Sequence, residues 1–175
     1  MLDRNFAMGL RAGKRKITED EKAFILKEIK RINADVDAFY IDEIGNQNTH
    51  YSQKTDLVVV GSNVFPDLEN PSNMTDKLSV ACVLAHEYYG HRSMREEYLK
   101  EETDTTNTAL DEFRASFLAY KNTPNLTDEE REILLYQAYE TAKNGSLEKE
   151  IKMCQKIIKQ MNKKAFEEQD EDNNN

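Results

Sequence analysis

Two histidines and a glutamate lie close together near the middle of the chain. Residues 86–91 read H-E-Y-Y-G-H, so His86 and His91 flank Glu87 within about one and a half helical turns. Imidazole nitrogens are common ligands of zinc, and a carboxylate beside a zinc-bound water can act as a general base. These residue types at this spacing indicate a zinc site that activates water for hydrolysis.

The spacing of the two histidines requires an irregular helix. Residues four apart lie about 40° apart around a regular α-helix, whereas residues five apart lie about 140° apart. A π-bulge can absorb the extra residue, and Gly90 best tolerates the resulting distortion. We therefore expect a helical irregularity at 86–91. The alternative is that His86 and His91 are unrelated core or surface histidines.

A second acidic segment follows in the next expected helix. Twenty-one residues after His91 stands Glu112, within the run D-E-F-R-A-S at 111–116. The two segments resemble the motif pair of the gluzincin metallopeptidases, and the H-E-x-x-G-H form with a downstream D/E-E-x-R-A run is similar to the dipeptidyl peptidase III family. The resemblance implies that His86, His91 and Glu112 are Zn²⁺ ligands and that Glu87 is the general base. A catalytic zinc keeps its remaining position for water.

The resemblance covers residues 86–116 and has one clear departure. The family has an acidic residue where this chain has Ser116, and such a residue usually orients a ligand histidine. Either Ser116, a backbone carbonyl or another carboxylate does this here, or the metal is held less firmly. The segment between the motifs is also shorter, closer to the thermolysin-like arrangement. Substrate specificity is therefore not carried over.

A zinc peptidase also needs a Tyr, His or Arg that stabilises the oxyanion. The candidates are His50, Tyr51, Arg114, Tyr120, Tyr136 and Tyr139. For each tyrosine the competing interpretation is packing, and Arg114 is equally able to pair with Asp111 or Glu112. Cys82 is either a fourth ligand or a packed thiol. The thiol is favoured, because one turn of helix separates Cys82 from His86.

The composition favours one soluble domain. The chain has 175 residues, 38% of them hydrophobic, which suits a single modest core. Its net charge of −9 argues against nucleic-acid binding and gives a weak preference for basic substrates. No apolar run is long enough to span a membrane, so no membrane association is expected. The two cysteines are too few for a disulfide scaffold and fit a reducing compartment.

Three regions divide the chain. Residues 1–17 form a basic leader without the apolar core of a secretory signal, so we expect a cytoplasmic protein, with delivery as an effector left open. Residues 18–168 are expected to form a single zincin-like metallopeptidase domain of undetermined oligomeric state. Residues 169–175 are polar and predict a disordered tail.

Helix signals dominate the central region. The pairs Thr18/Glu21 and Thr127/Glu130 have the spacing of capping boxes. Helices are expected over about 18–33, from 73 or 75 to 95, over 109–121 and 127–144, and from 146 onwards. Residues 36–41 and 49–61 predict two or three antiparallel strands. The predicted fold is α+β, a helix-dominated zincin-like domain with a small antiparallel sheet.

Two of these elements have alternative roles. The resemblance suggests that the strand within 57–61, or its neighbour, lies at the cleft edge and binds an extended peptide, whereas its continuous apolarity is equally typical of a buried central strand. The last helix has an apolar seam suited to another helix. Packing within the domain is favoured over a partner chain. The seam comprises Leu147, Ile151, Cys154, Ile158 and Met161.

The sequence thus predicts a zinc metallopeptidase that cleaves a peptide or protein with a metal-activated water. The alternative is a non-catalytic module that binds zinc structurally, or not at all, and docks a partner through its helical face. On a further interpretation, the chain is a fragment of a bacterial effector.

Overall fold

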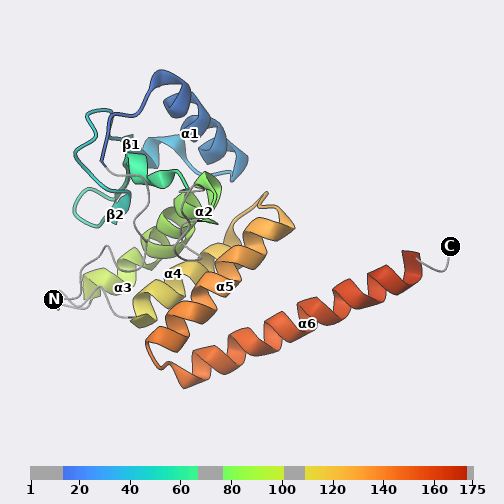
Figure 1. Ribbon diagram of the computed structural model, residues 1–175. Helices are drawn as coiled ribbons and strands as arrows, with labels where there is room; N and C mark the ends of the chain where they lie inside the picture. Colours follow the sequence, from blue (N-terminus) through green and yellow to red (C-terminus); the bar gives the residue numbers. More distant parts are fainter. Residues whose placement is uncertain (1–13, 67–76, 101–108, 173–175) are drawn as a thin grey trace.

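The chain folds as a helix-dominated α+β structure around a small sheet, as the computed structural model in Figure 1 shows. The structure describes residues 14–66, 77–100 and 109–172. Most of the leader expected at 1–17 lies outside these ranges, and so do both expected caps of the His86 helix, Asn73 and Thr75. The predicted fold class, α+β with helices dominating, is confirmed.

The first helix, α1 (Glu19–Arg31), begins at the predicted capping box. The Thr18 hydroxyl accepts a hydrogen bond from the Glu21 amide at 3.2 Å, and the Glu21 carboxylate accepts one from the Thr18 amide at 2.9 Å. Both amides would otherwise lack a partner within the helix. The apolar face of α1 then carries Ile25 and Ile29 into the core.

Three short strands form a mixed sheet rather than the antiparallel one that the sequence predicts. β3 (Leu57–Val60) is central, with β1 (Phe39–Ile41) parallel to it and β2 (His50–Ser52) antiparallel to it. The chain leaves β1, crosses to the opposite edge for β2, and reverses into β3, so β1 and β3 run in the same direction. The antiparallel prediction is wrong for β1 because residue patterns do not encode strand order.

The neighbourhood of the sheet settles two further expectations. The first half of the strand expected at 36–41 is a 3₁₀ turn, η2 (Val36–Ala38). The Asp35 carboxylate accepts from the Asp37 amide at 3.0 Å, a local bond that competes with extended structure. In β3, residues 58–60 are buried, so the interpretation of 57–61 as a buried central strand is confirmed. Of the two edge strands, β2 is the one closer to β3 in sequence.

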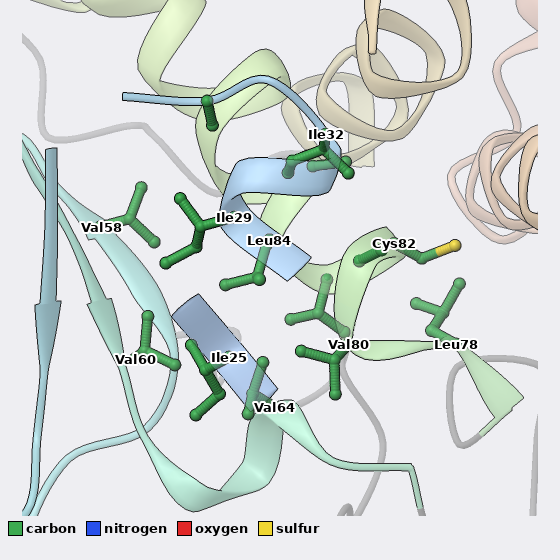
Figure 2. Packing of buried hydrophobic residues seen from close by; sticks show 14 of the residues in the cluster. Ile25, Ile29, Ile32, Val58, Val60, Val64, Leu78, Val80, Cys82 and Leu84 are labelled. Carbon is green, nitrogen blue, oxygen red and sulfur yellow. The ribbon is translucent and has the colours of Figure 1, made fainter. Parts of the chain in front are cut away.

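Helix α2 (Val80–Ala85) lies inside the core. All six of its residues are buried, and the Ser79 hydroxyl caps it by accepting from the Cys82 amide at 3.2 Å. Figure 2 shows side chains of α1 and β3 packed together with those of α2. Ile29, Val58 and Leu84 belong to this one cluster. A helix that is apolar on all sides has to be buried. Its continuation toward His86 therefore begins in the interior.

The remaining helices follow the predicted order. The chain continues past α2 through the π-helical turn η5 (His86–His91), the 3₁₀ turn η6 (Arg92–Met94) and α3 (Arg95–Lys100). Next come α4 (Ala109–Asn122) and α5 (Asp128–Asn144), which pack against each other. Within the described residues, none of these helices has the length and apolarity needed to cross a membrane.

The last helix, α6 (Glu148–Asp172), extends well beyond α5 (Figure 1). Its seam packs on a second cluster that contains Phe113 of α4 and Leu135 of α5, and Cys154 is fully buried there. Packing within the domain, the favoured interpretation of the seam, is confirmed. The helix also includes residues 169–172 of the expected disordered tail, whereas 173–175 lie outside the described residues.

One ion-pair network joins α1, α2 and α5. Arg31 donates to both carboxylate oxygens of Glu130, at 2.7 and 3.0 Å, and Ser79 donates to the same carboxylate at 2.7 Å. Burial alone would raise the pKa of Glu130, but the hydrogen bonds from Arg31, the Thr127 amide and Ser79 outweigh burial and lower it. The charged form of Glu130 therefore stabilises the fold.

We expect Glu130→Ala to lower the free energy of unfolding by about 2 kcal/mol, because it leaves the Ser79 hydroxyl without this acceptor and removes one of the two carboxylates that Arg31 contacts. Since the folded pKa of Glu130 is depressed, its contribution is complete above the unfolded value of about 4.3 and is lost as pH falls through the folded pKa. Urea unfolding at pH 7 and pH 3 measures this. Glu129→Ala, an exposed neighbour, is the control. An equal deficit at both pH values would contradict the prediction.

Candidate metal centre

The π-helical turn η5 brings the two histidines together. The helical irregularity predicted at 86–91 is confirmed, since these six residues form a π-helix between α-helical and 3₁₀ segments. An i→i+5 turn carries residues five apart to the same side of the helix. The rings of His86 and His91 accordingly lie with their centroids 4.8 Å apart, edge to face. The two histidines are therefore neighbours in space.

Two tyrosines between the histidines anchor this turn to the end of α1 and to β1. The Tyr89 hydroxyl donates to the carbonyls of Ile32 and Asn33, at 2.9 and 3.0 Å. Tyr88 stacks on Phe39 of β1 with ring centroids 5.4 Å apart. Both tyrosines thus contact the N-terminal half of the fold.

Gly90 allows η5 to touch the backbone of α4. A Cβ atom at Gly90 would lie 2.5 Å from the Ala115 carbonyl oxygen and 2.8 Å from its Cα, far inside contact distance. Gly90 does not have a positive φ. Gly90 therefore allows close approach to α4, whereas the sequence predicted that it tolerates a distorted backbone.

Glu112 of α4 reaches both imidazoles, as the sequence predicts. Its Oε2 atom lies 3.3 Å from Nε2 of His86, and its Oε1 atom lies 3.5 Å from Nε2 of His91. All three side chains are largely shielded from solvent, with exposed fractions between 5% and 17%. Each imidazole thus faces a different oxygen of the Glu112 carboxylate. His86, His91 and Glu112 do not together form one of the sets of possible metal ligands among the described residues.

The outer ring nitrogens face two further residues of α4. The Nδ1 atom of His86 is 3.1 Å from the Ser116 hydroxyl, and the Nδ1 atom of His91 is 3.6 Å from Oδ2 of Asp111. Of the alternatives left open for the missing acidic residue, Ser116 itself takes its place beside His86. The contact of Asp111 with His91 was not predicted from the sequence. The sequence signal for this contact was that Asp111 directly precedes Glu112 and therefore lies about 100° from it around the helix.

The edge strand β2 holds Glu87. The Glu87 Oε2 atom accepts a hydrogen bond from the Tyr51 backbone amide at 2.7 Å, and only 4% of the residue is exposed. One potential ligand atom each of His86, Glu87 and His91 lies within 4.8 Å of the others. Glu87 is thus fixed beside the histidines by a backbone group.

Acidic groups surround the histidines. His91, Asp111 and Glu112 form a second set of residues that could hold a metal ion, and it shares His91 with the first. Burial would lower the pKa of His91, but hydrogen bonding to Glu112 and the charges of Glu112, Glu87 and Asp111 outweigh it and raise this pKa to about 9. Burial would likewise raise the pKa of Glu112, yet both imidazoles hold it well below its usual range. The site favours positive charge.

Most candidates for oxyanion stabilisation have other contacts. The Tyr51 hydroxyl donates to Asp56 at 2.8 Å, and Arg114 faces Glu97 at 3.5 Å. Three tyrosines are partly buried on α4 and α5: Tyr120 packs on both apolar clusters, Tyr139 accepts from Gln155 of α6, and Tyr136 lies on α5. His50 lies on β2, where its Nδ1 atom contacts the Asn48 carbonyl at 2.8 Å.

Cys82 is a packed thiol and not a fourth ligand. Its side chain is fully buried, with Sγ 3.5 Å from the Glu130 carbonyl oxygen, and burial raises the pKa of the thiol to about 12. A protonated thiol is a poor metal ligand. The favoured interpretation of this residue is therefore confirmed.

Comparisons with models of protein families, with curated proteins and with solved structures found no match for this chain. The gluzincin resemblance thus remains a prediction that depends on the two short motifs.

We expect Gly90→Ala to lower the free energy of unfolding by about 1–3 kcal/mol, because the added methyl group collides with backbone atoms that cannot turn aside. The double variant Gly90→Ala/Ala115→Gly separates the causes. Since the collision involves the Ala115 backbone, removing the Ala115 side chain should give no recovery. Urea unfolding followed by circular dichroism measures both. Full recovery in the double variant would show that the contact is between side chains.

Proposed function

We propose that this protein is a zinc-dependent metallopeptidase that cleaves a peptide or protein. The observation that carries the proposal is the position of the Glu112 carboxylate against the Nε2 atoms of His86 and His91, whose outer nitrogens face Ser116 and Asp111. Histidines that bind zinc are typically held in this way, with the second ring nitrogen directed at a neighbouring polar group. A chance contact of two histidines does not require this arrangement.

Each contact between an imidazole and Glu112 supports zinc ligation. Bonds of about 2.0–2.2 Å and tetrahedral angles place two zinc ligands about 3.4 Å apart. The Nε2 atom of His86 lies 3.3 Å from Oε2 of Glu112 and that of His91 lies 3.5 Å from Oε1, so each pair by itself has the separation of two zinc ligands. Two histidines and one glutamate are also a ligand set of catalytic zinc sites, which use three protein ligands, whereas structural sites are closed by four. His86, His91 and Glu112 would be the ligands.

The chain itself supplies the base. Zn²⁺ in this site would lower the pKa of water and polarise the substrate carbonyl. The Tyr51 amide fixes Oε2 of Glu87, which leaves Oε1 to take a proton from the attacking water. As the water oxygen bonds to the carbonyl carbon and the C–N bond breaks, Glu87 passes this proton to the amine nitrogen. The products are a carboxylic acid and an amine.

The edge strand β2 supports a peptide substrate. β2 pairs only with β3 in the three-stranded sheet, and its Tyr51 amide already points at Glu87. An extended peptide that adds to this edge would run beside the base, with main-chain hydrogen bonds that hold it regardless of sequence. The neighbour of β3, and not β3 itself, is thus the strand suited to this role.

The proposal first predicts metal binding. Zinc content should be about one ion per chain, and Glu112→Ala should abolish it. Ser116→Ala should weaken Zn²⁺ affinity by about 10–100-fold, because His86 loses the group that orients it. Ser116→Asp should restore the affinity. Competition with a chromogenic chelator measures all four proteins, with the exposed Glu97→Ala as control. Equal Zn²⁺ affinity in wild type and Glu112→Ala would refute the ligand assignment.

The second prediction concerns Glu87→Gln in the zinc-loaded protein. Glutamine keeps an oxygen for the Tyr51 amide but cannot take a proton, so cleavage of fluorescein-labelled casein and of capped random hexapeptides should fall at least about 100-fold. Zinc content should not change. The exposed Glu96→Gln is the matched control. Undiminished cleavage by Glu87→Gln would overturn the role of Glu87, and a zinc-loaded wild type without any activity would favour the non-catalytic module.

A further inference from the structure

Two arginines that directly follow the histidine turn converge on one carboxylate. Arg92 of η6 lies with a terminal guanidinium nitrogen 3.2 Å from Oδ2 of Asp56, and the Nε atom of Arg95 lies 3.4 Å from Oδ1. Asp56 is the residue before β3, at the end of the turn that joins β2 to β3. The cluster therefore connects the strand beside Glu87 to the helix that carries the two histidines.

The cluster has an excess of positive charge. Two guanidinium groups share one carboxylate, which already accepts a hydrogen bond from the Tyr51 hydroxyl at 2.8 Å. Within the described part of the chain, Asp56 is the only acidic ion-pair partner of either arginine. In a protein with a net charge of −9, two positive charges here face one negative charge. A local positive field attracts an anionic group at short range, where screening is weak.

Both arginines also have hydrogen-bond donors left over. Their Nε atoms are buried and make no hydrogen bond within the described residues, although that of Arg95 lies 3.4 Å from Oδ1 of Asp56. Their side chains remain 29% and 43% exposed, so part of each side chain is within reach of a ligand. The Arg92 guanidinium lies 5.0 Å from the centre of the Tyr88 ring, which fixes its position before a ligand arrives. Paired guanidinium forks match the geometry of a carboxylate.

The cluster lies close enough to the reacting bond to contact a neighbouring substrate residue. Arg92 follows His91 directly, and consecutive Cα atoms are about 3.8 Å apart. An extended peptide advances about 3.4 Å per residue. A guanidinium group at the end of a long side chain is therefore within about three substrate residues of the cleaved bond.

The following inference rests on the proposed function. We propose that Arg92 and Arg95 form a subsite that binds a carboxylate of the substrate. Peptides with a negative charge near the cleaved bond are then preferred. The carboxylate belongs either to an Asp or Glu side chain or to the free C-terminus of the peptide. This local preference is opposite to the weak preference for basic substrates that the net charge predicts.

Three hexapeptide pools test the subsite, with cleavage followed by mass spectrometry. All have acetylated N-termini. The first contains Asp and Glu and has amidated C-termini, the second has Asn and Gln instead, and the third is the second pool with free C-termini. Zinc-loaded wild type should cleave the first or the third pool about tenfold faster than the second, and the faster pool identifies the source of the carboxylate.

Variants then locate the preference. Arg95→Gln should bring the rates for all pools to the rate for the neutral pool, whereas Arg95→Lys should keep part of the preference because it keeps the charge. Arg95 is the more exposed of the two, and its loss leaves the Arg92–Asp56 pair in place, so the variant should fold. Lys54→Gln removes an exposed charge from the same turn and is the control, with no expected change. Zinc content confirms that each variant has an intact site.

The outcomes separate this inference from the proposed function. Equal cleavage of all three pools by wild type, or a preference that survives in Arg95→Gln, would overturn the subsite and leave the peptidase proposal standing. A preference lost equally in Lys54→Gln would show a general surface-charge effect and would also overturn it. No cleavage of any pool by the zinc-loaded wild type would overturn the proposed function, and the subsite with it.

Discussion

The close contact between the η5 turn and α4 determines the geometry of the site. At Gly90 the two backbones approach to a distance that no other residue permits, with the Ala115 carbonyl directly opposite. Glu112 and Ser116 lie on either side of Ala115 in sequence, so this contact brings both to the histidines. Helices usually pack with their axes 8–10 Å apart because side chains separate them. With a side chain at Gly90, the Glu112 carboxylate would be carried away from both rings.

The site concentrates polar groups where the fold would otherwise be apolar. His86, Glu87, Asp111 and Ser116 are all buried, the first two directly after the entirely apolar helix α2 and the other two on α4. Buried polar groups are costly unless they are paired. Here each has a partner within the site or on β2. Such a group of mutually dependent polar residues adds little to stability compared with apolar packing.

Local signals in the sequence predicted much of this structure. The capping boxes at Thr18 and Thr127 mark true helix starts because both partners of each bond lie within four residues. The irregular turn at 86–91 followed from the angle between two side chains on one helix. The meeting of the histidines with Glu112 was expected from the motif resemblance, since nothing in the spacing alone requires it.

Long-range relations account for what the sequence did not predict. The parallel pairing of β1 depends on the path of the chain between strands, which residue patterns do not record. The contact of Tyr51 with Glu87 uses a backbone amide, and every residue except proline has one, so no side-chain pattern distinguishes it. Gly90 was noticed because glycine tolerates backbone distortion, but its role is to contact the backbone of α4, which comes later in the chain.

The single additional residue of the π-helix also sets the phase of the helix that follows. Deleting Tyr88 or Tyr89 would restore regular α-helical geometry and would leave the histidines four apart. It would also rotate everything downstream by about 100° about the helix axis and shift it by about 1.5 Å. The arginines at 92 and 95 would then turn away from the β2–β3 turn, so conversion to the shorter motif requires compensating changes well beyond the histidines.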